Sequence, residues 1–379
     1  MSQPIRWGII STGYISTSFA KDLLVDPATR DVYDVKHKIT AVGSRSVESA
    51  DKFIEGLKNS EGVHSWGLTS GVLDGVMGYG TYEEVFNDPN VDVVYIGTPH
   101  TFHHPNSKAA LLAGKHVLCE KPFTFDLEEL DELIKIAKEK KLFLMEAVWT
   151  RFHPIAYAVQ EELFSGKLGK IKRFQADFSM DMKPETADPK HRMLNPDLGG
   201  GSLLDMGPYP SVWAMLCMQH HPSNQNRPPK LLSSYQTVLK RTGVDLNSRW
   251  LLEWEGVGQG LLLTEMGVKG FGPMTALVQC EEADLAIHWP PYKPESYTIH
   301  THPQNRDSPE TQAVTHHVPI HPGIGMHYEA DEVARCLLAG KLESDRMPWE
   351  ESRIVQGWFD EVRKAGDTVH KDWKGHAGE

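Results

Sequence analysis

Cysteine is scarce in this 379-residue sequence, and its few copies are isolated from one another. Cys119, Cys217, Cys280 and Cys336 form no CxxC pair and have no spacing typical of a zinc site. Widely separated thiols of this kind are typical of reduced, buried cysteines in a cytosolic protein. The sequence therefore predicts neither a disulfide framework nor a metal centre held by cysteine.

The sequence also lacks long apolar runs and an excess of positively charged residues. No uninterrupted apolar stretch is long enough to cross a bilayer, and no signal peptide precedes the first strand-like segment. The formal net charge is -12, and the acidic balance argues against nucleic acid or an anionic membrane as the main partner. We expect a cytoplasmic protein whose partner is a small molecule.

Strand-like and helical segments alternate over the first 147 residues. This alternation predicts βαβ units and a parallel sheet, that is, a doubly wound Rossmann domain over residues 1–147. Asp126 is the expected N-cap of a strongly amphipathic helix, 126–140. The expected strands are 5–10, 39–43, 91–96, 115–119 and 142–145, and the other helices are 15–24 and 106–113.

The pattern changes after about residue 150, where longer segments alternate in polarity as half-exposed antiparallel strands do. They predict an α+β domain over residues 148–379 with a large, open, mostly antiparallel sheet, whose uncovered face is a natural oligomer surface. The last helices are free to pack back on the first domain. Expected strands are 171–180, 230–240, 249–255, 258–266, 276–289 and 296–302; expected helices are 155–164, 203–218, 328–339 and 349–365.

Two segments read as loops, residues 220–229 and 302–322. The second contains His302, His316, His317 and His321, but their spacing is not that of a metal site. We therefore predict no metal.

The turn after the first strand reads Gly8-Ile-Ile-Ser11-Thr-Gly13-Tyr-Ile-Ser16. It departs from the dinucleotide motif GxGxxG because serine occupies both outer glycine positions. Gly13 would still allow a pyrophosphate to approach the following helix N-terminus closely. Any tight strand-to-helix turn fits the same letters, but the position at the start of a βαβ chain favours a dinucleotide site. Its contacts would come from Ser11, Thr12, Gly13, Tyr14 and Ile15.

The second strand ends in Ser44-Arg45-Ser46, without the carboxylate that NAD-preferring sites use for the ribose 2′-hydroxyl. One cation and two hydroxyls suit a 2′-phosphate instead, which favours NADP over NAD. The alternative is that Arg45 is a solvated residue at a helix start.

Four motifs then occur in order: Gly97-Thr-Pro-His100, Glu120-Lys121-Pro122, residues 146–154 (EAVWTRFHP) and residues 199–210 (GGGSLLDMGPYP). Together they closely resemble the Gfo/Idh/MocA oxidoreductases, from Trp7 to about Ala365. Within that family, the sequence is similar to the dimeric dihydrodiol dehydrogenases and above all to the fungal NADP-dependent D-xylose 1-dehydrogenases. Residues 141–150, 191–197 and 325–332, and the long connection 22–38, carry the likeness to the fungal enzymes.

The resemblance implies a catalytic group. Tyr209 matches the position of the family's catalytic tyrosine, where other branches use histidine. A free tyrosine has a pKa of about 10, and the Lys121 ammonium and an oxidised nicotinamide would favour its ionised form. Asp205, one helical turn before Tyr209, would position the pair or a sugar hydroxyl. The alternative for Tyr209 is an aromatic side chain packed between domains.

The resemblance also implies the groups that bind cofactor and sugar. Thr98, Pro99, His100 and Glu120 would lie along the cofactor with Lys121, and the Lys121–Pro122 bond would be cis. Trp149 would stack on the C–H face of a sugar, with Arg151 and Asp205 as polar partners. His191 and Arg192 would close over the sugar; exposed surface is the alternative for them.

These residues lead to one function and two alternatives. We expect NADP-dependent oxidation of an aldopyranose at C1, D-xylose preferred, to the 1,5-lactone. The first alternative is oxidation of trans-dihydrodiols, which would need an aromatic-lined pocket. The second is an NADP-binding sensor without catalysis, which would need neither Lys121 nor Tyr209.

Overall fold

The structure is a computed structural model that describes residues 3–59, 73–303, 312–320, 322–373 and 376. The chain divides into two compact units. Unit 1 contains residues 1–149, 320–353 and 374–379, and unit 2 contains residues 150–319 and 354–373. The second domain expected over 148–379 therefore includes a segment, 320–353, that groups with unit 1.

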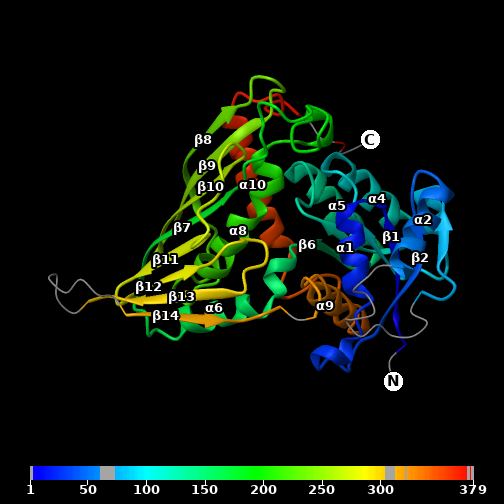
Figure 1. Cartoon of the computed structure of the whole chain (residues 1–379), viewed down its shortest axis with the longest axis horizontal. Helices are drawn as coiled ribbons and strands as arrows, with labels where there is room; N and C mark the ends of the chain where they lie inside the picture. Colours follow the sequence, from blue (N-terminus) through cyan, green and yellow to red (C-terminus); the bar gives the residue numbers. More distant parts are fainter. Residues whose placement is uncertain (1–2, 60–72, 304–311, 321, 374–375, 377–379) are drawn as a thin grey trace. The chain divides into compact units, whose positions relative to one another are not determined.

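Unit 1 is built on a six-stranded parallel sheet with the order β3-β2-β1-β4-β5-β6 (Figure 1). The chain reverses its direction of progress across the sheet between β1 and β4, which is the ligand-binding point of doubly wound folds. The predicted Rossmann architecture is confirmed. The strands are β1 (Ile5–Ile10), β2 (His37–Gly43), β3 (Met77–Tyr79), β4 (Val93–Ile96), β5 (His116–Glu120) and β6 (Leu144–Ala147).

Local sequence explains where the helices of unit 1 begin. The Asp126 carboxylate accepts the Glu129 N–H at 2.9 Å, which confirms the predicted cap of α5. Thr81 and Glu84 form a capping box at α3. The helices are α1 (Tyr14–Leu23), η1 (Pro27–Arg30), α2 (Val47–Lys58), α3 (Tyr82–Asn87), η3 (His100–Phe102), α4 (His103–Leu112), α5 (Leu127–Lys140), α9 (His327–Leu338) and the start of α10 (Trp349–Ala365).

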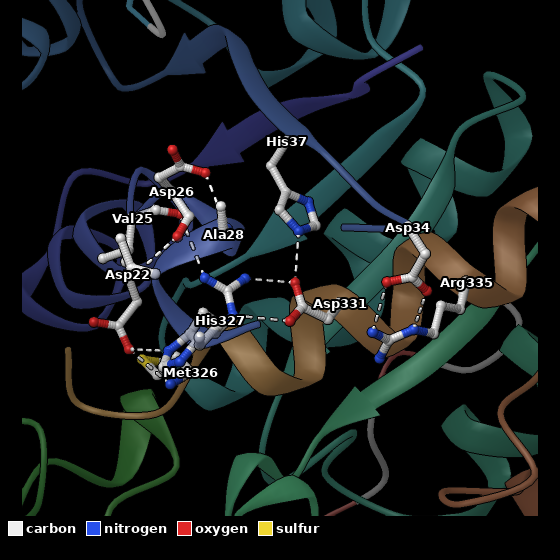
Figure 2. A network of polar contacts seen from close by, with 12 residues as sticks. Asp22, Val25, Asp26, Ala28, Asp34, His37, Met326, His327, Asp331 and Arg335 are labelled. Atoms are coloured by element: carbon white, nitrogen blue, oxygen red, sulfur yellow. Dashed lines mark hydrogen bonds and ion pairs between the residues drawn. The ribbon is translucent and has the colours of Figure 1, made fainter. Parts of the chain in front are cut away.

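Helix α9 is tied to the first part of unit 1 by buried charges (Figure 2). Arg30 donates to both oxygens of Asp331, at 2.6 and 3.0 Å. His37 bonds the same carboxylate through Nε2 at 2.9 Å, while its Nδ1 accepts the Trp7 indole N–H at 3.2 Å. The Trp7 contact requires an unprotonated Nδ1, so His37 is neutral and donates from Nε2 to Asp331.

A second buried carboxylate holds the turn before α9. The Asp22 side chain accepts the backbone N–H groups of Ile324, Gly325 and Met326 at 2.7–3.1 Å. His327 Nδ1 lies 3.3 Å from the same carboxylate (Figure 2). The last turn of α1 therefore anchors a helix some 300 residues later in the chain.

Unit 2 contains an eight-stranded sheet with the order β14-β13-β12-β11-β7-β10-β9-β8. Strands β7 and β10 pair in parallel, and the other neighbouring pairs are antiparallel. The predicted large, mostly antiparallel sheet is confirmed. The strands are β7 (Ile171–Ser179), β8 (Lys230–Val238), β9 (Asp245–Trp254), β10 (Gly258–Glu265), β11 (Ala276–Cys280), β12 (Ala283–Ile287), β13 (Ser296–Thr301) and β14 (Ala313–His317).

One face of this sheet packs against helices. Trp250 and Trp254 of β9 meet Phe359 and Trp358 of α10 edge to face, and α7 (Ser202–Met206) and α8 (Pro208–Ala214) contact β7, β9 and β10 (Figure 1). No helix within the described residues of unit 2 covers the opposite face (Figure 1). The other helices described in unit 2 are η4 (Trp149–Phe152), which begins at the last residue of unit 1, α6 (Pro154–Phe164), η5 (Pro196–Leu198), the π-helical η6 (Met215–Gln219) and η7 (Pro222–Asn224).

Three of the segments expected from the sequence have a different secondary structure in the fold. The expected strand 276–289 reverses at the exposed pair Glu281-Glu282, so that β11 and β12 form a hairpin. The expected loop 302–322 contains β14, whose mostly exposed residues give no alternating pattern. The expected helix 203–218 is divided into α7 and α8 because Pro208 and Pro210 have no N–H to donate, and α8 continues into a π-helical turn, Met215–Gln219.

His321 of the expected histidine loop lies outside the described residues. Among the residues that are described, no group of three or more His, Cys, Asp or Glu side chains is arranged to hold a metal ion. In the same residues, no helix has the length and hydropathy needed to cross a membrane.

Candidate functional site

The turn between β1 and α1 has the form of a dinucleotide-binding turn despite its serines. Ser11 has a φ of 83°, the left-handed region that glycine usually supplies, and its N–H donates to Gly43 O at 3.0 Å. Gly13 is exposed and extended at the N-cap of α1, and no side chain caps the helix. The first N–H groups of α1 are thus placed to receive a phosphate.

A glycine elsewhere in the chain replaces the missing third glycine of the motif. Ser16 is fully buried on α1, with its hydroxyl 3.5 Å from Ile10 O. A side chain at Gly97, directly after β4, would collide with the Ser16 hydroxyl. Helix and sheet therefore approach closely because residue 97, rather than residue 16, lacks a Cβ.

The end of β2 lies beside this turn. The Thr12 and Ser44 hydroxyls are 3.2 Å apart, and Ser44 is 6% exposed. Arg45 is exposed, and the Ser46 hydroxyl caps α2 by accepting the Ser49 N–H at 3.2 Å. Ser44, one of the residues predicted to bind the 2′-phosphate, thus lies beside the first turn. The Ser46 hydroxyl, another of them, already accepts a hydrogen bond within the chain.

The ends of β4 and β5 carry the other predicted cofactor residues. Lys121 is half-buried, and the peptide bond between it and Pro122 is cis, as the resemblance implied. Glu120 is 4% exposed; its carboxylate accepts the Tyr95 hydroxyl at 2.5 Å and the Lys121 N–H at 3.2 Å. Burial and the neighbouring Glu120 charge raise the pKa of Tyr95. Tyr95 therefore remains a hydrogen-bond donor that fixes Glu120.

The segment after Lys121 is held by side chains from several elements. The Phe123 N–H donates to Glu146 at 3.2 Å, and the Ser352 hydroxyl donates to the other oxygen of Glu146 at 2.7 Å. His103, a residue that sequence reasoning missed, contacts Pro122 O and Thr98 O. Thr98 and His100 are each 8% exposed, and Pro99 is exposed.

In unit 2, two predicted substrate residues form an ion pair. Arg192 Nη1 lies 2.6 Å from an Asp205 carboxylate oxygen; the Arg192 side chain is 56% exposed and that of Asp205 8%. The neighbouring His191 is exposed, and its Nδ1 accepts the Met193 N–H at 3.3 Å. Asp205 is therefore held by a cation that itself faces solvent.

Tyr209 lies in a group of aromatic side chains that the sequence did not reveal. Its ring meets Phe178 and Tyr292 edge to face, at centroid distances of 5.4 and 5.7 Å. Trp289 lies 5.5 Å from Phe178. These rings come from β7 and the segment after β12, and no periodicity links such positions in a sequence.

The start of α7, which carries Asp205, is fixed by a buried aspartate. One Asp245 oxygen accepts the Ser202 hydroxyl and the Leu203 N–H at 2.7 Å and the Ser248 hydroxyl at 2.8 Å. A side chain at Gly201 would collide with Asp245, which gives the last glycine of the 199–201 triplet a steric role. Asp245 is a second residue that the motifs did not indicate.

The junction residues Trp149 and Arg151 are 5% and 1% exposed. Lys121 belongs to unit 1, whereas Asp205 and Tyr209 belong to unit 2. Their joint action, and the substrate contacts of Trp149 and Arg151, stay predictions.

Comparison with known proteins agrees with this architecture. Residues 5–148 match the model of the Gfo/Idh/MocA oxidoreductase family, NAD-binding Rossmann fold, and residues 157–285 match a Gfo/Idh/MocA C-terminal domain. The sequence is 35% identical to D-xylose 1-dehydrogenase (NADP(+)) of Hypocrea jecorina, over 97% of this chain and 93% of that protein. It is 32% identical to trans-1,2-dihydrobenzene-1,2-diol dehydrogenase of Danio rerio, over 97% and 98% of the two chains.

Solved structures share the fold. A 3-ketoreductase from Actinomadura kijaniata, KijD10, in complex with NADP and TDP-benzene, superposes with a TM-score of 0.76 at 23% identity, over 96% of this chain and 98% of that one. The matched family models, the relatives and the six-stranded Rossmann sheet agree. The chain belongs to the Gfo/Idh/MocA oxidoreductase family.

Proposed function

We propose that the protein oxidises an aldopyranose at C1 with NADP⁺, with D-xylose as the preferred substrate and the 1,5-lactone as the product. The observation that carries the proposal is the Arg192–Asp205 ion pair, one helical turn before Tyr209. A cation and a carboxylate are suited to sugar hydroxyls, and the phenol is the group that handles the proton. The 35% identity to a D-xylose 1-dehydrogenase supports the choice of sugar.

Each group has a defined task in this reaction. Bound NADP⁺ supplies the acceptor for the C1 hydride. Tyr209, as phenolate, accepts the proton of the C1 hydroxyl, so that the C1–O single bond becomes the lactone carbonyl. The Lys121 ammonium favours the phenolate by charge. Asp205 and Arg192 orient the ring hydroxyls, and Trp149 and Arg151 complete the sugar contacts.

NADP rather than NAD is the cofactor. Arg45, Ser44 and Thr12 form a polar group at the end of β2 that contains a cation and no carboxylate, which suits the extra phosphate. The H. jecorina relative is named for NADP(+), and KijD10 was solved with NADP. We further propose that the enzyme is cytoplasmic and forms a homodimer through the uncovered face of the unit 2 sheet.

A second candidate function is oxidation of trans-dihydrodiols of arenes. Phe178 and Tyr292 meet the Tyr209 ring, and Trp289 meets Phe178, so that these side chains offer an apolar, aromatic wall. The relative from D. rerio is named for this reaction. An NADP⁺ reduction assay with D-xylose, D-glucose, L-arabinose and a trans-dihydrodiol separates the two candidates, and a higher kcat/KM for the dihydrodiol would reject the sugar proposal.

Two substitutions test the proton step. Lys121→Met removes the cation and Tyr209→Phe removes the phenol, and each is expected to lower kcat by about 10²–10⁴-fold, the usual cost of losing an acid–base group. Steady-state NADP⁺ reduction measures the effect. Tyr235→Phe is the matched control, since Tyr235 is an exposed tyrosine on β8 of the same unit, and it should leave kcat within a few-fold. Turnover within a few-fold of wild type in either test variant would contradict the assigned roles.

A further inference from the structure

We propose that His103 is a positioning residue that ties the Lys121–Pro122 turn to the turn after β4. The expected effect on kcat rests on the proposed function, which gives Lys121 a task in turnover. The tie between the two turns rests on the contacts of the buried His103 ring alone.

His103 is the first residue of α4 and is 1% exposed. Its Nδ1 lies 2.7 Å from Pro122 O, and its Nε2 lies 2.8 Å from Thr98 O. Pro122 follows β5 and Thr98 follows β4, and these two strands are neighbours in the parallel sheet. One ring thus bridges the carboxyl ends of two strands, at the edge where doubly wound folds bind their ligands.

The chemistry of the ring suits this bridge. Burial, with the charges of His100 and Lys121, lowers the pKa of His103 to about 3. The ring is therefore neutral near pH 7 and carries one N–H. A neutral ring donates its single N–H to one of the two carbonyls, so each tautomer makes a hydrogen bond to one of the two turns.

Each turn carries a different part of the proposed site. Pro122 directly follows Lys121, whereas Thr98 directly precedes Pro99 and His100. The Thr98 turn is held on its other side by Asn106, whose amide lies 3.2 Å from the Thr98 hydroxyl. Loss of the bond to Pro122 should displace the lysine and lower kcat, because small misplacement of a reacting group is costly. Loss of the bond to Thr98 should weaken cofactor binding.

Two conservative substitutions separate the two bonds. In His103→Asn, the asparagine amide nitrogen takes the place of Nδ1 and can still donate to Pro122 O. In His103→Gln, the glutamine amide nitrogen takes the place of Nε2 and can still donate to Thr98 O. His103→Ala removes both contacts. His104→Gln is the matched control, since His104 is a buried histidine of the same helix that bonds Glu132 on α5 at 2.7 Å.

The readouts are kcat for NADP⁺ reduction and the Kd of NADPH from fluorescence titration, with thermal unfolding to confirm that each variant is folded. We expect His103→Ala to lower kcat by about 10–100-fold and to raise Kd by about fivefold or more, the loss of one hydrogen bond. His103→Asn should restore kcat but not Kd, and His103→Gln should restore Kd but not kcat.

The proposal is wrong if His103→Ala changes kcat and Kd no more than His104→Gln, or if Asn and Gln restore both quantities equally. A wild-type enzyme that oxidised no sugar would reject the proposed substrate alone. The NADPH titration of the four variants would then still decide the role of His103.

Discussion

At the scale of single residues, Arg45 is expected to set the cofactor preference. It is exposed at the end of β2, and the neighbouring Ser44 hydroxyl lies 3.2 Å from that of Thr12 in the first turn. A hydrogen bond to a charged group contributes about 1.5–3 kcal/mol. Arg45→Ala should therefore lower kcat/KM for NADP⁺ by about 10–100-fold and leave that for NAD⁺ nearly unchanged, as measured by initial rates with each cofactor.

Lys58→Ala is the matched control for Arg45, because Lys58 is an exposed cation at the far end of α2, the helix that begins directly after Arg45 and its N-cap Ser46. It should not alter the ratio of the two kcat/KM values. Equal losses with NADP⁺ and NAD⁺ in Arg45→Ala would show that the guanidinium does not recognise the 2′-phosphate.

The first turn shows what a motif can and cannot reveal. Its position after β1 and its central Gly13 were sufficient to predict a dinucleotide turn. The reason that serine is tolerated at position 16 was not visible, because the compensating glycine is Gly97, 81 residues later. Likewise, the Arg192–Asp205 bond and the role of Asp245 depend on loop geometry rather than on spacing.

At the scale of elements, α9 depends on a buried ion pair. Arg30, His37 and Asp331 have side chains no more than 3% exposed. Removal of one partner from such a group leaves a buried charge without compensation, which typically costs about 3–5 kcal/mol. Asp331→Asn should lower the free energy of unfolding by about that amount at pH 7, as measured by urea denaturation followed by circular dichroism.

This network also predicts a dependence on acid. Burial alone would raise the pKa of Asp331, but the bonds from His37 and Arg30 lower it to about 2. Its stabilising contribution is present above the ordinary value of 3.8 and is lost as the pH falls from there through about 2. Burial lowers the pKa of His37, so the neutral ring adds a loss of stability as the pH falls below 6.5.

The exposed pair Asp34–Arg335 is the matched control, since it joins the same parts of unit 1 at 2.7 Å with side chains 57% and 43% exposed. Asp34→Asn should cost no more than about 1 kcal/mol. In Asp331→Asn the fall in stability between pH 4 and pH 2 should be shallower than in the wild type. Equal costs for the two substitutions would contradict a special role of burial.

Elements with a clear apolar pattern were those that the sequence could predict. Ile5–Ile10 and Trp349–Ala365 were found with their observed bounds, since one face or the whole segment is buried. The short strand β3 and the exposed strand β14 were not, because pairing with a neighbour, rather than burial, defines them. Backbone hydrogen bonds to distant residues leave little signal in local composition.

At the scale of the whole molecule, the uncovered face of the unit 2 sheet is the proposed homodimer surface. Three leucines lie in one row across the centre of this face. Leu251 of β9 pairs with Leu261 of β10. Gln175 of β7 follows in the row and separates Leu261 from Leu277 of β11. Leu263 lies on the same face two residues further along β10, and Leu261 is 36% exposed. Apolar side chains grouped on an open sheet face are typical of a binding surface.

A charge placed on this face should separate the subunits. Wild type is expected to have twice the 42.6-kDa chain mass by light scattering, and Leu261→Arg should shift it to the monomer mass because a buried unpaired charge costs far more than an apolar contact contributes. Leu338→Arg, at an exposed leucine of α9 in unit 1, is the control and should leave the mass unchanged. A wild type that is monomeric by light scattering would rule out this face as the interface. A Leu261→Arg variant that stays dimeric would also rule it out, because an arginine at position 261 could then only be in contact with solvent.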